Sequence, residues 1–138
     1  MERTFLVLGA VLGLVGVALG AFGSHALRAK LPPDRVATFE TGVRYQLVHA
    51  LALFAVVVVG GIRIADPSMS SVYLIAEGTI EWPAAVAGWL FVGGVVLFSG
   101  SLYALALTGR RSLGAITPIG GLCLLGGWAL LILAAAIA

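Results

Sequence analysis

The chain has few charged residues, because eight basic and six acidic side chains make up only 10% of its 138 residues. Hydrophobic residues make up 61%, and the mean hydropathy is +1.12. A typical soluble domain has about 25% charged residues, and a small domain needs polar residues to cover its large surface. The composition therefore excludes an ordinary soluble enzyme, a disordered tail and a nucleic-acid binder. It is the composition of a membrane protein.

Cysteine and catalytic motifs are also scarce. The single cysteine, Cys123, excludes an intramolecular disulfide framework and a multi-cysteine zinc site. The sequence has no GxSxG nucleophile elbow, no HExxH metal motif and no phosphate-binding loop, and no expected helix carries a pair of closely spaced carboxylates. We therefore expect no enzyme activity, no metal site and no cofactor.

Four long apolar runs account for most of the sequence. A membrane-spanning helix needs roughly 20 mostly apolar residues, and the backbone in lipid must form its hydrogen bonds internally. The runs are continuous rather than alternating, which indicates helices and not barrel strands. We predict an all-α integral membrane bundle, a single domain over residues 1–138, with four transmembrane helices at about residues 4–23, 43–62, 83–107 and 113–138.

The connections between the runs hold most of the charge. The first connection, 24–42, ends in a segment, 34–42, that we expect to be an amphipathic start to the second helix. The second, 63–82, is the longest and most acidic, with a turn expected over 67–71. The third, 108–112, is so short that the third and fourth helices should be antiparallel neighbours.

Lysine and arginine in short loops predict the orientation, because cytoplasmic loops carry an excess of them. Only Arg3 and Arg63 belong to the side of the termini. The other side has six basic residues, namely Arg28, Lys30, Arg35, Arg44, Arg110 and Arg111. We therefore expect loops 24–42 and 108–112 in the cytoplasm and both termini outside. The first run is long for a signal peptide, so we expect it to be retained as a span.

The first run has five glycines at spacings of four, three, four and three residues, which places them on one helix face. They are Gly9, Gly13, Gly16, Gly20 and Gly23. Small residues let helices approach closely in lipid. We expect a helix-packing face and expect the first helix to be the most closely packed element. A dimerisation face and a narrow polar passage are the alternatives.

Polar residues at membrane depth are energetically expensive and are candidates for function. Glu40 and Arg44 are four residues apart and share a helix face, where they can pair. His49 lies about 7 Å deeper than Arg44. His25 is expected on the same side of the membrane, where it could face His49. We expect one polar cluster at this end, made of His25, Glu40, Arg44, Tyr45, Gln46, His49, Ser101, Tyr103 and Thr117.

This cluster has two main interpretations. It is either a hydrogen-bonded network that fixes helix register or a site for a ligand, a lipid headgroup or a proton. A metal site formed by the two histidines and Cys123 lacks any supporting spacing motif. Thr117 and Pro118 predict either a helix that begins there or a longer helix from Leu113 that is kinked at Pro118.

Several motifs resemble the YgdD-like family of small inner-membrane proteins of unknown function, also called domain of unknown function 423. They are residues 20–27 (GAFGSHAL), 39–46 (FETGVRYQ), 49–53 (HALAL), 98–103 (FSGSLY), 116–121 (ITPIGG) and 127–128 (GW). The resemblance covers about residues 6–131 and is weakest over 69–81. It implies four transmembrane helices in the bacterial inner membrane, which is the plasma membrane, and brings no established reaction.

Two functions follow from these observations. The first is an accessory or interaction protein packed through its Gly-rich helix faces, with membrane lipids and a homo-oligomer or larger membrane complex as partners. The second is binding or transport of a small molecule, lipid or ion through the polar cluster. Neither function involves nucleic acid.

Overall fold

The computed structural model describes residues 1–61 and 81–137. Within them lie four long helices, α1 (Glu2–Phe22), α2 (Pro33–Gly61), α3 (Trp82–Thr108) and α4 (Thr117–Ile137). All four are long and apolar enough to cross a membrane, which confirms the predicted all-α membrane fold. The acidic connection expected over 63–82 lies almost wholly outside the described residues, as do its turn at 67–71 and Arg63.

The starts of α2 and α4 follow from proline. α2 begins at Pro33 with Asp34 in its first turn, so the predicted amphipathic segment is the first part of this helix. α2 has 29 residues and is about 43 Å long, which exceeds a hydrocarbon core of roughly 30 Å. α4 begins at Thr117 with Pro118 in its first turn, after a 3₁₀ turn at Arg111–Ala115. The interpretation without a kink at Pro118 is therefore confirmed.

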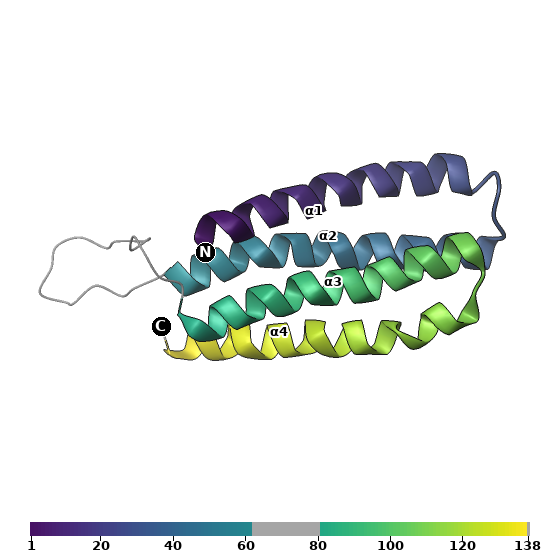
Figure 1. Ribbon diagram of the computed structural model, residues 1–138. Helices are drawn as coiled ribbons and strands as arrows, with labels where there is room; N and C mark the ends of the chain where they lie inside the picture. The colour runs from purple at the N-terminus through teal and green to yellow at the C-terminus, as the bar shows by residue number, and fades with distance from the viewer. Residues whose placement is uncertain (62–80, 138) are drawn as a thin grey trace, which may run out of the picture.

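The four helices lie side by side in chain order, with α2 and α3 in the middle and α1 and α4 outside (Figure 1). The N-terminus and the end of α4 lie at one end of the molecule. The connections at 23–32 and 109–116 form the other end, which we call the basic end because it has Arg28, Lys30, Arg110 and Arg111. A π-helical turn, Gly23–Leu27, extends α1 toward it.

Two groups of buried side chains hold the helices together. The larger group joins α2, α3 and α4 and includes Leu53, Val56, Phe91 and Leu124, and Phe5 of α1 packs into it. The smaller group lies toward the basic end, where Leu27, Phe39, Val43 and Ala106 are buried. Apolar contact therefore runs along the whole length of the central pair, whereas α1 joins it mainly through α2.

Of the five glycines in α1 and its π-helical extension, four face α2. A methyl group at any of them would lie 3.4 Å or less from an α2 side chain or carbonyl group, which holds for Gly9, Gly16, Gly20 and Gly23. Gly13 has no such atom within 4 Å. The expectation that this helix is the most closely packed is wrong. In the apolar 18-residue stretch of this span, only 17% of the residues are buried, against 50% for α2. The reason is that α1 has one main neighbour and α2 has two.

Candidate functional site

The structure divides the predicted polar cluster into separate groups. An ion pair lies at the basic end, a network joins three helices through Gln46, and a hydroxyl pair joins α3 to α4. A fourth group surrounds His49 beside a groove. His25 belongs to none of them. It is exposed, and in the described part of the chain no hydrogen bond or ring contact joins it to His49.

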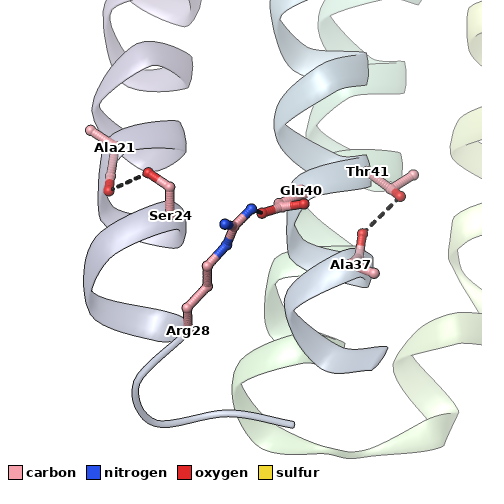
Figure 2. A network of polar contacts seen from close by, with 6 residues as sticks. All are labelled: Ala21, Ser24, Arg28, Ala37, Glu40 and Thr41. Atoms are coloured by element: carbon pink, nitrogen blue, oxygen red, sulfur yellow. Dashed lines mark hydrogen bonds and ion pairs between the residues drawn. The ribbon is translucent and has the colours of Figure 1, made fainter. Parts of the chain in front are cut away.

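Figure 2 shows the group at the basic end, where Arg28 reaches from the end of the α1 extension to Glu40 of α2. The Nη2 to Oε1 distance is 2.9 Å, and the side chains are 64% and 38% exposed. The expected pair of Glu40 with Arg44 is therefore wrong, because a residue from the neighbouring segment takes the carboxylate. Ser24 and Thr41 donate to carbonyl oxygens within their own helical segments and do not join this pair.

Gln46 links three helices. Its side chain is buried, and its Nε2 donates to the carbonyl oxygen of Leu12 in α1 over 2.8 Å. Its Oε1 accepts a 2.8 Å hydrogen bond from the Tyr103 hydroxyl of α3. Both ends of the amide are bonded to protein atoms, so this part of the cluster fits the interpretation of a network that fixes helix register.

Two serines of α3 lie in the same half of the molecule. Ser101 Oγ donates to the carbonyl oxygen of Phe98 over 2.9 Å and lies 2.8 Å from Thr117 Oγ1. Since the Ser101 proton is used, Thr117 is the donor in the second bond. This pair ties the start of α4 to α3. Ser99 is buried, and its hydroxyl has no hydrogen-bond partner among the described residues.

His49 is held from two helices. Its Nε2 accepts a 3.1 Å hydrogen bond from Nε1 of Trp128 in α4. Its Nδ1 lies 2.7 Å from the carbonyl oxygen of Tyr45, so Nδ1 carries the ring proton and donates. The rings of Tyr45, Phe91 and Trp128 surround the imidazole, with centroids 5.4–6.0 Å away. Sequence analysis missed Trp128, which lies 79 residues from His49 with no spacing pattern to connect them.

A groove of about 790 Å³ lies between α2 and α4, with Phe98 of α3 between them. Most of its lining is apolar or aromatic. The lining residues are Arg44, Tyr45, Val48, His49, Phe98, Pro118, Gly121, Leu122, Leu124, Leu125 and Trp128. Arg44 lies toward the basic end and is exposed, and its guanidinium forms no hydrogen bond or ion pair with any described residue. The groove can therefore accept an elongated apolar group beside one free positive charge.

Metal ligands do not gather in this site. Within the described ranges, no three side chains of the His, Cys, Asp or Glu type come together. Cys123 is a free thiol on α4 and is partly exposed. The chemistry that these residues offer is hydrogen bonding and charge, from the Arg44 guanidinium and the Tyr45 hydroxyl.

Comparison with known proteins gives a family. Residues 19–121 match a family of proteins of unknown function, DUF423. The chain is 41% identical over 133 residues to the UPF0382 membrane protein YwdK of Bacillus subtilis, covering 96% of each chain. It is 42% identical over 131 residues to the UPF0382 membrane protein SH2409 of Staphylococcus haemolyticus, covering 95% of this chain and 93% of the relative. No solved structure gives a significant match. The chain is thus a membrane protein of the DUF423 family, the family that its sequence motifs resemble.

Proposed function

We propose that this protein binds an amphipathic ligand in the groove between α2 and α4. The observation that carries the proposal is the groove itself, with about 790 Å³ of space, mostly apolar walls and one free arginine. Ligand sites in proteins commonly have roughly 300–1,000 Å³ and a few polar groups in an apolar lining. Its walls are transmembrane helices with exposed leucines such as Leu122 and Leu125, so a ligand would enter from the bilayer.

We further propose that the protein lies in the bacterial inner membrane with loops 24–42 and 108–112 in the cytoplasm and both termini outside. The unequal number of basic residues on the two sides supports this orientation. Trp82 and Trp89 are 64% and 52% exposed near the start of α3, at the end away from the basic end, which suits an interfacial position.

The test is to fill the groove at Gly121. A Cβ atom there would meet nothing closer than the Phe98 ring at 3.7 Å, so the backbone has room for a side chain, and Gly121→Leu should extend from the groove wall into the groove. The matched control is Gly100→Leu. A Cβ atom at Gly100 would have no neighbouring atom within 4 Å, and Gly100 does not line the groove. Both variants add the same side chain to a transmembrane helix.

Each protein is incubated with vesicles of phosphatidylcholine and phosphatidylglycerol, extracted in mild detergent and examined by native mass spectrometry. We expect the unchanged protein and Gly100→Leu to retain one phospholipid per molecule. For Gly121→Leu, we expect most molecules to appear without a bound phospholipid. Equal retention by Gly121→Leu, or no retained phospholipid in the unchanged protein, overturns the proposal.

An accessory or interaction role is the second candidate. Gly13 of α1 and Gly93 and Gly100 of α3 have no atom within 4 Å of the position where a side chain would begin. Open small residues on a transmembrane surface allow a second helix to approach closely, in a homo-oligomer or a larger membrane complex. Gly93→Leu combined with Gly100→Leu should then abolish association in native mass spectra. A monomer for the unchanged protein contradicts this role.

A further inference from the structure

We propose that the groove selects a phospholipid with an anionic headgroup, whose phosphate binds Arg44, and that the Arg28–Glu40 ion pair keeps Arg44 free for it. The inference rests on the proposed function and names the ligand class of the same groove. Three observations carry it, namely the charge of the groove, the position of Arg44 along α2 and the partner of Glu40.

The charge of the groove is positive and uncompensated. Arg44 is its one charged lining residue apart from the titratable His49, which is neutral in this hydrogen-bonding pattern. A guanidinium can donate two parallel hydrogen bonds to one phosphate group, and the Tyr45 hydroxyl lines the same groove. Among the described residues, no acidic side chain lines the groove to receive the cation of a choline or ethanolamine headgroup. Charge complementarity therefore favours a headgroup with net negative charge.

The position of Arg44 along α2 would also place it near the depth of a lipid phosphate. It follows Pro33 by eleven residues, about 16 Å along α2. Since α2 is longer than the hydrocarbon core by roughly 13 Å, the excess length at the basic end would place Arg44 close to the headgroup boundary. Acyl chains would then run past Val48, Leu125 and Trp128, deeper in the groove. The apolar lining commits the occupant to a lipid rather than to free phosphate.

The partner of Glu40 explains why Arg44 is available. Glu40 precedes Arg44 by four residues, a spacing that allows an ion pair on one helix. Arg28 instead binds Glu40 from the extension of α1, at 2.9 Å (Figure 2). Arg28 is thus a positioning residue, since it withdraws the carboxylate that would otherwise neutralise the groove. A local ion pair would keep Arg44 from a phosphate.

The first experiment measures headgroup preference in the groove. Trp82→Phe and Trp89→Phe leave Trp128 as the only tryptophan of the chain. The protein is reconstituted in phosphatidylcholine vesicles with a small fraction of brominated phosphatidylglycerol or brominated phosphatidylcholine, and quenching of Trp128 fluorescence is followed. We expect an apparent affinity about tenfold higher for phosphatidylglycerol, the size of one charge-assisted interaction.

Arg44→Gln should abolish this preference and leave the residual quenching by phosphatidylcholine unchanged. Arg111→Gln is the matched control, because it removes the same charge from the basic end but does not line the groove. Equal quenching by the two lipids, or the same loss in Arg111→Gln, overturns the inference. Gly121→Leu separates the two proposals. If it leaves quenching by both lipids unchanged, the groove itself is not a lipid site and the proposed function fails.

The second experiment tests the role of Arg28. In the same vesicles, Arg28→Gln should reduce the preference for phosphatidylglycerol about twofold, the size of one ion pair between residues four apart on a helix, because Glu40 becomes free to pair with Arg44. Adding Glu40→Gln to Arg28→Gln should restore the preference. Lys30→Gln removes a positive charge from the same connection and should change nothing. Loss of preference without rescue by Glu40→Gln contradicts the positioning role.

Discussion

The two outer helices use glycine in different ways. In α1, a methyl group added at Gly16 would lie 2.7 Å from Cδ2 of Leu47, the flexible end of a side chain. In α4, a methyl group added at Gly120 would lie 2.8 Å from Cα of Phe98 and even closer to its backbone nitrogen. At these two positions α1 therefore packs against the end of a side chain, whereas α4 packs against the backbone of α3.

This difference separates a rigid part of the molecule from an adjustable one. Near Gly120 the approach of α4 to α3 is limited by main-chain atoms of Phe98, which cannot rotate away, and Phe98 also lines the groove. Near Gly16 the approach of α1 to α2 is limited by a side chain that can change rotamer, and no described residue of α1 lines the groove. The groove thus adjoins the less adjustable of these two contacts.

Gly120→Ala should have the largest effect on stability. The added methyl group would overlap the backbone of Phe98, so α3 and α4 would have to separate, at a cost of about 3 kcal/mol. The check is thermal unfolding in detergent, with Gly121→Ala as the control. The nearest atom to a methyl group at Gly121 is 3.7 Å away, so the control should stay within about 0.5 kcal/mol. Similar losses in both variants would show that overlap with the Phe98 backbone is not the cause of the loss.

The glycine spacing in α1 predicts its packing face, because residues three and four apart share one side of a helix. The same spacing cannot reveal which atoms lie opposite. Gly16 faces a leucine side chain and Gly120 faces main-chain atoms, yet neither sequence context marks the difference. This is why hydropathy correctly predicts a bundle of four apolar helices, whereas α1 is wrongly expected to be the most closely packed helix.

The candidate site follows a similar division. The polar residues of α2 stand out at membrane depth, so Gln46 and His49 are selected correctly as buried polar groups. Their partners come from distant segments, as with Trp128 for His49, and no local rule connects them. The error at Glu40 has the same origin, since a pairing rule for one helix cannot anticipate an arginine brought in by the end of its neighbour.

Gln46→Leu should have the second largest effect, because its amide ties the adjustable helix α1 to α2 and α3. The substitution leaves the hydroxyl of the half-buried Tyr103 without its acceptor and removes the bond to the Leu12 carbonyl group. We expect a loss of about 1–2 kcal/mol. A double-mutant cycle with Tyr103→Phe measures the coupling between the two side chains. Strict additivity would show that this hydrogen bond does not hold α3 to α2.

Gly16→Ala should cost less, about 1 kcal/mol, because the Leu47 side chain can change rotamer to make room. Gly13→Ala is the control on the same helix, because a methyl group added at Gly13 would have no neighbouring atom within 4 Å. It should be neutral or stabilise the protein by up to about 1 kcal/mol, since alanine favours helix over glycine. Unfolding of both variants in the same detergent gives the comparison. A loss for Gly16→Ala as large as for Gly120→Ala would mean that α1 is as rigidly held as α4.

Arg28→Gln should have the smallest effect on stability. The ion pair with Glu40 is exposed on both sides, and such pairs contribute about 0–1 kcal/mol, with the lower values typical of flexible side chains. What little it contributes should disappear in high salt, because exposed charges are screened. Thermal unfolding at low and high ionic strength checks both points. A change in the free energy of unfolding well above 1 kcal/mol would mean that this ion pair is a main contribution to the contact between α1 and α2. A small change, together with altered lipid preference in vesicles, would separate the role of Arg28 at the groove from any role in the fold.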